Sequence, residues 1–293
     1  MKKLGSIFGK GILGCMIIPI ITALVSGGGT LQKTNQGEEM ELLLAQEAVL
    51  EIPFGYPFEA VKAQTVLIRS RYQKRLEQGD TKEELYQEIW QKQKRLGWEE
   101  TEFCESMKIC EKAARETENV VLSYCGEVVE GAYFLAGNGS TRDGIEVFSD
   151  CSYGWLTQVE NSCDLDGPDY LSAVTKSSQE VEEKLYRETG EITEGALEEQ
   201  IEICSRDSAG YVMIIRVGNT MLSGERFRKV MGLSSSCFYI QFENENVRFV
   251  CQGVGHGMGL CQYGASVLAK EGADYQEILR FYFPEAELTC IDF

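Results

Sequence analysis

Residues 253–265 read GVGHGMGLCQYGA and contain His256, the only histidine of the chain. Glycine stands at every second position from 253 to 259. Because glycine carries no Cβ atom, such a segment can adopt unusual backbone angles and approach a ligand or another part of the chain closely. We expect His256 to be either a site residue or the packed centre of a tight turn, and the composition of this segment does not decide between the two.

A second segment, residues 51–72, reads EIPFGYPFEAVKAQTVLIRSRY. Residues that precede a proline avoid the helical region, so a first helix is predicted to end at about Glu51. Pro57 stands at a favourable position for the first turn of a second helix. Glu51 is therefore expected at a junction between two helices, where its side chain can project into a cleft.

The two segments together resemble the stage II sporulation protein D family of peptidoglycan-cleaving enzymes, which includes the amidase-enhancer proteins. The family reads E-M-P near its start and G-x-G-H-G-x-G-M-S-Q-Y-G-A near its end, and this chain carries both motifs in that order. Residues 222–235 resemble a third family motif between them. The resemblance covers residues 39–290.

The resemblance implies that Glu51 is the catalytic acid of a lytic transglycosylase. Such an enzyme cuts the MurNAc–GlcNAc linkage without water and leaves a 1,6-anhydro sugar. The carboxyl group must be neutral to protonate the leaving oxygen, which requires an apolar or crowded setting. The same group then takes the proton of the sugar's 6-hydroxyl, so no second carboxylate is needed. The apolar setting is expected from Ile52, Pro53, Phe54 and Phe58. The alternative is that Glu51 only caps or charges a helix end.

Further residues are candidates for contacts with a glycan, each beside a structural alternative. His256 is either a sugar contact or a stabiliser of the glycine loop, and Tyr263 is either a sugar contact or a buried aromatic. Arg69 is interpreted first as a structural ion pair and second as a partner of a glycan carboxylate. The complete set of substrate-binding candidates is Arg69, Asn138, Ser140, Thr141, His256, Gln262 and Tyr263.

No metal or other cofactor is expected. Some family members hold zinc through a histidine and a cysteine in one loop, and this chain has Leu135 and Asn138 at those positions. A single histidine also excludes a zinc site built on two histidines. Cys261 stands where the family usually has serine, but five residues of a glycine-rich turn do not define a thiol–imidazole dyad with His256.

The chain of 293 residues has a formal net charge of −18, which argues against nucleic acid as a partner. At its N-terminus, lysines precede an apolar run over 11–25, a pattern typical of a secretory signal. We interpret 1–29 as an uncleaved, single-pass membrane anchor in preference to a cleaved signal peptide. Residues 30–38 are interpreted as a linker, and 39–293 as one catalytic domain outside the cytoplasm.

Eleven cysteines are present, and Cys15 lies in the predicted anchor. The remaining even number suits the disulfides of an exported protein, although their pairing cannot be deduced from sequence. Cys104 and Cys110 are not expected to pair, because six residues along a helix point their side chains in different directions.

The predicted fold class is α+β, with N-terminal helices packed against antiparallel strands. Apolar periodicity and capping signals predict helices over 41–50, 57–72, 80–96, 100–115 and 274–283, and an acidic helical stretch over 177–202 interrupted at Gly190. Alternating patterns predict strands over 120–124, 127–134, 211–217, 238–242 and 247–251.

The resemblance implies a role in remodelling the septal wall during engulfment, with peptide-stripped glycan strands as substrate. It also implies partners like stage II sporulation proteins P, an amidase, and M. The alternative from another class is a glycan-binding module that enhances an amidase without cutting, which Leu135 favours and Glu51 disfavours. A third reading is a hydrolytic glucosaminidase or muramidase.

Overall fold

The computed structural model describes residues 36–96, 100–190 and 195–291. The predicted anchor over 1–29 lies outside these residues. Among the described residues, no helix is both long and apolar enough to cross a membrane. The first described helix begins at Gln36, inside the segment predicted as a linker.

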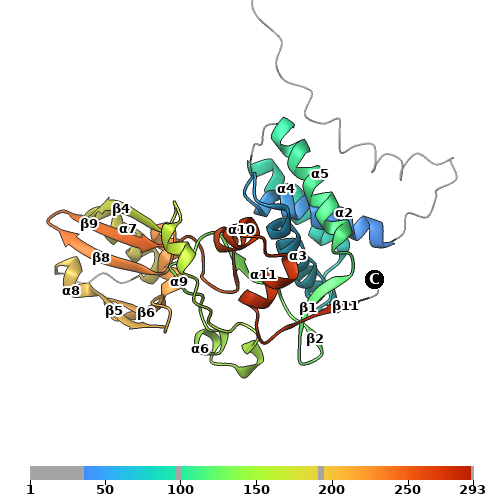
Figure 1. Ribbon diagram of the computed structural model, residues 1–293. Helices are drawn as coiled ribbons and strands as arrows, with labels where there is room; N and C mark the ends of the chain where they lie inside the picture. Colours follow the sequence, from blue (N-terminus) through green and yellow to red (C-terminus); the bar gives the residue numbers. More distant parts are fainter. Residues whose placement is uncertain (1–35, 97–99, 191–194, 292–293) are drawn as a thin grey trace, which may run out of the picture.

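The N-terminal part of the chain forms a bundle of helices, seen at the right of Figure 1. Pro57 precedes the central helix with a φ of −57° and a ψ of 145°, as expected for the residue that begins a helix. The predicted stripe of this helix is buried through Val61, Ile68 and Tyr72, which pack against the other helices. The helices are α2 (Gln36–Glu51), α3 (Phe58–Glu77), α4 (Lys82–Leu96) and α5 (Glu100–Glu116).

Five short strands, in one three-stranded and one two-stranded sheet, and two C-terminal helices form a second core with the other side of α3. The hairpin between β1 and β2 turns through Cys125 and Gly126, both with positive φ, as the sequence predicted. β3 pairs in parallel with β10, which brings the glycine-rich segment beside the helices. The elements are β1 (Val120–Tyr124), β2 (Glu127–Val128), β3 (Tyr133–Phe134), β10 (Leu260–Cys261), α10 (Gln262–Lys270), α11 (Tyr275–Tyr282) and β11 (Glu287–Cys290).

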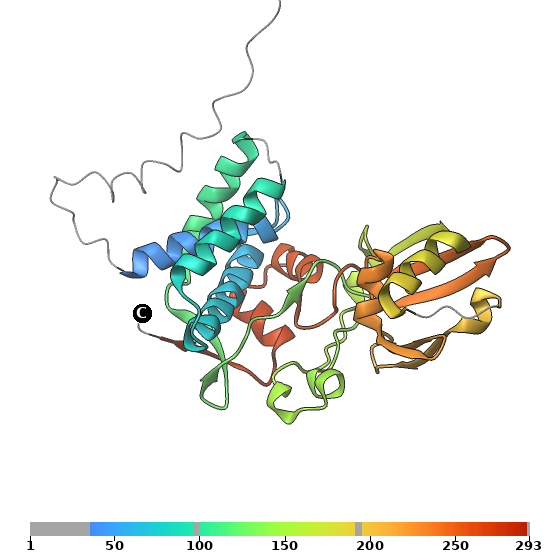
Figure 2. The same ribbon diagram turned by 180° about the vertical axis from the view of Figure 1, so that it is seen from behind.

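A second lobe lies at the opposite end of the molecule, as Figures 1 and 2 show. Two antiparallel three-stranded sheets, ordered β4-β9-β8 and β5-β6-β7, enclose a core that contains Phe227, Phe238 and Phe249. Its strands are β4 (Leu171–Ser177), β5 (Ile201–Arg206), β6 (Val212–Val217), β7 (Thr220–Ser223), β8 (Phe238–Glu243) and β9 (Asn246–Gln252). Its helices are α7 (Ser178–Thr189), α8 (Leu197–Gln200) and α9 (Gly224–Met231), while α6 (Gly144–Phe148) belongs to the segment that joins the lobes.

The fold is of the α+β class, as predicted, and two element predictions need correction. Residues 201–206 form β5, whereas an acidic helix was predicted as far as 202. Residues 127–134 are not one strand but the separate strands β2 and β3. The break has a steric reason, because a Cβ atom on Gly131 would lie 2.3 Å from the carbonyl oxygen of Leu67 on α3.

Candidate active site at the end of helix α2

Glu51 is the last residue of α2, at the junction with α3 that the sequence predicted. Its side chain is 29% exposed, and its Oε1 atom lies 2.8 Å from Nζ of Lys92 on α4. The predicted apolar setting is not what the structure shows. Ile52 is buried, but Phe54 is 53% exposed. The ring of Phe58 lies 4.7 Å from the ammonium of Lys112. The nearest partner of Glu51 is therefore a cation.

Glu47, Glu51, Arg71 and Lys92 form one group of ion pairs, which we term the charge cluster. The side chain of Glu47 is 2% exposed, and its Oε1 atom lies 2.6 Å from Lys92 and 2.9 Å from Arg71. Burial lowers the pKa of Lys92, but the hydrogen bonds and charges of Glu47 and Glu51 outweigh burial and raise this pKa. The ammonium therefore stays charged at neutral pH.

Tyr133 of β3 completes this environment from a different part of the chain. Its hydroxyl is buried and forms no hydrogen bond of normal geometry with any described residue, although the guanidinium of Arg71 lies 5.2 Å from its ring. Burial holds the pKa of the Tyr133 hydroxyl above its usual range, opposed by the charge of Arg71 and reinforced by that of Glu51. This hydroxyl is thus neutral at neutral pH. The sequence did not single out Glu47, Arg71, Lys92 or Tyr133 as site residues, although Arg71 lies within the quoted segment 51–72 and Tyr133 within the strand predicted over 127–134.

Gln262 connects the glycine-rich segment directly to Glu51. The Nε2 atom of Gln262 donates to the backbone carbonyl of Glu51 at 2.8 Å, across 211 residues of sequence. The same atom lies 2.7 Å from Oε1 of Gln64 on α3. The side chain of Gln262 is buried, so the predicted glycan contact is wrong for this residue. Gln262 is instead a positioning residue that holds the end of α2.

The glycine loop has the close backbone contacts that its sequence predicted. Gly253, Gly255, Gly257 and Gly259 all have positive φ, between 72° and 115°. A Cβ atom on Gly257 would lie 2.3 Å from the ring of Tyr211. The alternating glycines therefore let this loop lie against both lobes.

His256 is half-buried within this loop. Its Nδ1 atom accepts a hydrogen bond from the backbone N–H of Met258 at 3.1 Å, and its ring centroid lies 5.9 Å from that of Phe134. Burial lowers the pKa of His256, which keeps the imidazole neutral at neutral pH. These contacts support the loop-stabilising role, and a contact with a glycan stays a prediction.

The predicted residues Asn138, Ser140 and Thr141 lie between β3 and α6, and each forms hydrogen bonds with other parts of the chain. The Nδ2 atom of Asn138 donates to the carbonyl of Ala209 at 2.8 Å, and Ser140 Oγ accepts from Gln158 at 2.9 Å. Thr141 is buried and its hydroxyl accepts from the N–H of Val159. The side chains of Asn138, Ser140 and Thr141 thus form hydrogen bonds with other residues of the protein, and their contact with a glycan stays a prediction.

Arg69 is completely buried, which corrects its reading as a substrate-binding residue. Its Nε and Nη2 atoms donate to the two carboxylate oxygens of Glu41 at 3.0 and 2.6 Å. The remaining donors reach the carbonyls of Ala114 and Val120 and the hydroxyl of Thr117. No part of the guanidinium is left for a ligand, so the structural interpretation is correct.

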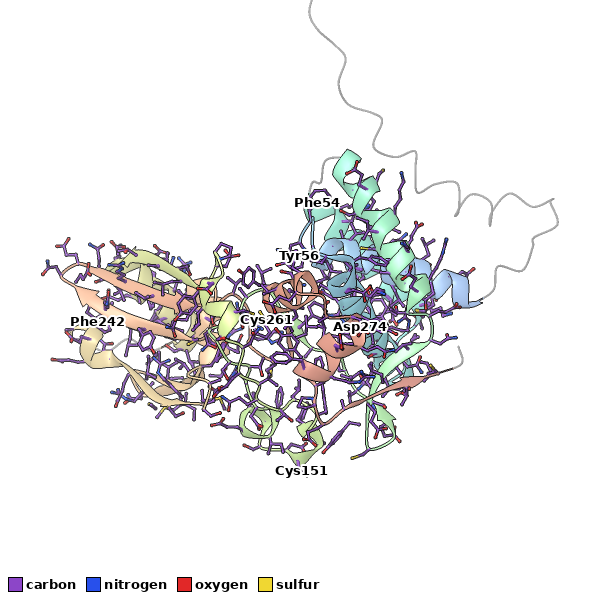
Figure 3. All side chains as sticks on the ribbon, viewed as in Figure 1. Phe54, Tyr56, Cys151, Phe242, Cys261 and Asp274 are labelled. Carbon is purple, nitrogen blue, oxygen red and sulfur yellow. The ribbon has the colours of Figure 1, made fainter. Side chains whose placement is uncertain are left out.

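Cys261 pairs with a carboxyl group and not with His256. Its buried Sγ lies 3.1 Å from Oδ1 of Asp164, while Oδ2 of Asp164 has no hydrogen-bond partner. Burial raises the pKa of Asp164 to about 6 and that of Cys261 well above its usual range, so the thiol is unreactive at neutral pH. Half-buried Tyr263, two residues after Cys261, donates its N–H to the carbonyl of Leu135 at 3.0 Å. Figure 3 shows Cys261 between the two lobes.

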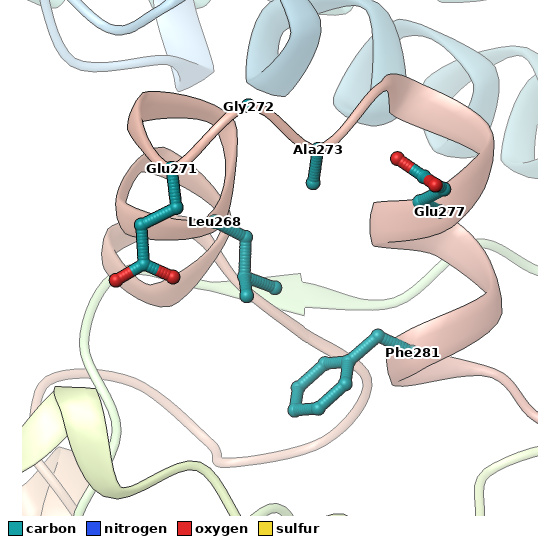
Figure 4. A pocket seen from close by; sticks show the side chains of 6 residues that line it. All are labelled: Leu268, Glu271, Gly272, Ala273, Glu277 and Phe281. Carbon is teal, nitrogen blue, oxygen red and sulfur yellow. The ribbon is translucent and has the colours of Figure 1, made fainter.

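The described part of the chain contains no group of three potential ligands for a metal ion. Its ten cysteines outside the predicted anchor are free thiols in the structure. A hollow of about 410 Å³ lies between α10 and α11 (Figure 4). None of the predicted site residues lines it; the lining residues are Leu268, Glu271, Gly272, Ala273, Glu277 and Phe281.

The fold and site define an α+β protein in which a glycine-rich loop holds a glutamate at a helix junction. Comparison with known proteins agrees with this class. The family model described as stage II sporulation protein matches residues 30–124. Stage II sporulation protein D of Bacillus amyloliquefaciens is 26% identical over 256 residues, which cover 83% of this chain and 72% of that protein.

Stage II sporulation protein D of Bacillus subtilis (strain 168) is 25% identical over 194 residues, 66% of this chain and 54% of that protein. The amidase enhancer of the same organism is 23% identical over 227 residues, 61% of this chain and 32% of that protein. The N-terminal third of the chain thus matches the model of this family, and most of the chain is similar to stage II sporulation protein D of two Bacillus species. The names of the family model and of the two stage II sporulation proteins connect these proteins with sporulation.

Proposed function

We propose that this protein is a lytic transglycosylase that cleaves the MurNAc–GlcNAc linkage of peptide-stripped glycan strands and leaves 1,6-anhydro ends. The observation that carries the proposal is the hydrogen bond from Gln262 to the carbonyl of Glu51. It joins the two family motifs at one glutamate. The half-exposed carboxyl group of Glu51 is accessible to a ligand, unlike those of Glu41 and Glu47.

In the proposed reaction Glu51 acts twice. Its protonated carboxyl group first donates to the leaving glycosidic oxygen, and the resulting carboxylate then removes the proton of the 6-hydroxyl, which attacks the anomeric carbon. The proton that leaves Glu51 in the first step is thus replaced in the second. The backbone contact with Gln262 supports this role because it restrains the end of α2 on which Glu51 stands.

The cellular setting is part of the same proposal. The protein would act outside the cytoplasm from an N-terminal membrane anchor, on septal peptidoglycan during engulfment. An amidase like stage II sporulation protein P would strip the stem peptides first, and a protein like stage II sporulation protein M would be a further partner. These assignments rest on the family resemblance.

The test compares the wild type with Glu51→Gln on peptide-stripped glycan strands, with products read by mass spectrometry. The matched control is Glu105→Gln, at an exposed glutamate of α5 far from the cluster in sequence. We expect anhydro-ended fragments from the wild type and the control, and none from Glu51→Gln. New reducing ends would instead identify a hydrolytic glycosidase.

The second candidate is a glycan-binding module that enhances an amidase. It is favoured by the ion pair between Glu51 and Lys92, because the carboxylate of the proposed acid is already engaged by an ammonium 2.8 Å away. The similarity to an amidase enhancer points the same way. A folded wild type that binds glycan strands, leaves them uncut and stimulates an amidase would support this candidate and refute the enzyme.

A further inference from the structure

We propose that Lys92 is the specificity-determining cation of this site and exchanges Glu51 for the lactyl carboxylate of a peptide-free muramic acid residue. The inference rests on the proposed function, since it names the group by which the substrate would be recognised. A muramic acid residue exposes this carboxylate only when no stem peptide is attached to it. Lys92 would thus distinguish a stripped strand from one that still carries peptides.

The exposure of the charge cluster determines which ion pair a ligand can replace. The side chain of Lys92 is 40% exposed and that of Glu51 29%, whereas that of Glu47 is 2% exposed. Glu47 also has a second cation, Arg71, at 2.9 Å. Glu51 is therefore the weaker and more accessible of the two carboxylates on Lys92, and an anion from solvent displaces Glu51 first.

The charge of the cluster explains how this exchange prepares the acid. Glu47 and Glu51 balance Arg71 and Lys92, so a substrate carboxylate adds a third negative charge. Opposing carboxylates in one site disfavour simultaneous ionisation. The cluster becomes neutral again when the displaced Glu51 takes one proton from solvent, and that proton is the one that the proposed reaction requires.

Other elements add further titratable groups around the charge cluster. Tyr133 from β3 has a buried hydroxyl that forms no hydrogen bond of normal geometry within the described part of the chain, and its ring lies 5.2 Å from the guanidinium of Arg71. From α3, Tyr72 faces Glu47. From α4, Glu88 is held by both terminal nitrogens of Arg75. Tyr133 is thus a neutral polar group beside the charge cluster, next to the guanidinium of Arg71.

The experiment uses the full chain and two forms of the same peptide-free strands. One form keeps its free lactyl carboxylates, and in the other they are converted to neutral methylamides. Binding and cleavage are measured separately for the wild type, Lys92→Gln and Lys92→Arg. The control Lys94→Gln lies on the same helix, where Lys94 sits over the ring of Trp90. Thermal unfolding checks that each variant is folded.

We expect the wild type to prefer the free carboxylates by about tenfold or more, as for other hydrogen bonds between charged groups. Lys92→Gln should abolish this preference, while Lys92→Arg and Lys94→Gln should keep it. Equal treatment of both strands by the wild type, binding to neither, or a preference that survives in Lys92→Gln overturns the inference. A Lys92-dependent preference in binding without any cleavage upholds it and refutes the transglycosylase instead.

Discussion

Replacement of Arg69 by methionine separates a structural role from a substrate-binding one. Methionine has a similar length and is apolar, so Arg69→Met removes the charge without opening a large cavity. Arg69 is fully buried, and Glu41, its carboxylate partner, has a side chain that is only 9% exposed. The variant therefore leaves the charge of Glu41 buried without a counter-ion.

The expected loss in the free energy of unfolding is about 3–5 kcal/mol at neutral pH, the usual cost of breaking a buried ion pair from one side. The loss should depend on pH. Burial already raises the pKa of Glu41 above its ordinary value of 4.5, and Arg69 opposes this shift. Without Arg69 the pKa rises further, so the folded state binds more protons than the unfolded state. The stability of the variant therefore falls as the pH rises above 4.5.

Urea unfolding, followed by circular dichroism at neutral and mildly acidic pH, measures both effects. The double variant Glu41→Leu/Arg69→Met removes both charges and should recover most of the lost stability. Glycan binding is measured in parallel on each folded variant. An Arg69→Met variant with the stability of the wild type but without glycan binding would refute this reasoning and restore Arg69 as a substrate contact.

Two further predictions use the same unfolding assay. Gly257→Ala places a Cβ atom 2.3 Å from the ring of Tyr211, whereas Gly272→Ala, at a φ of 104°, meets nothing within 4 Å. Gly272→Ala should lose only the backbone strain of about 1–2 kcal/mol; an equal or smaller loss for Gly257→Ala would contradict the predicted clash. Because burial raises the pKa of Asp164, this carboxyl group stays protonated to a higher pH in the folded protein than in the unfolded chain. The free energy of unfolding therefore falls as the pH rises from 3.8 to about 6. Asp164→Asn should remove this component, about 3 kcal/mol, and an unchanged pH slope would show that Asp164 is not its source.

Much of the local structure follows from signals that neighbouring residues carry. Pro53 and Pro57 separate α2 from α3 because proline restricts both its own backbone and that of the residue before it. Thr81 and Glu84 form the predicted capping box, in which each side chain accepts from the backbone N–H of the other residue. The unusual backbone angles of the alternating glycines were also predictable, because glycine tolerates a positive φ.

The environment of the site was less predictable than its position. In residues 201–206 the apolar Ile201 and Ile203 flank Glu202, and pairing with β6 makes this segment a strand despite its acidic neighbours. Arg69 and Gln262 are polar, and polar side chains are usually exposed. Both are buried because partners distant in sequence, Glu41 for one and Gln64 for the other, satisfy their donors.

The sequence by itself determined that Glu51 stands between two helices, which residues could form the glycine loop, and which family the chain resembles. Only the tertiary structure decided that Lys92 and Tyr133 surround Glu51 and that Gln262 holds its backbone. The physical reason is that helical and turn preferences act between near neighbours. Charge pairing, burial and the pKa shifts that follow from them arise between elements that meet only when the chain packs.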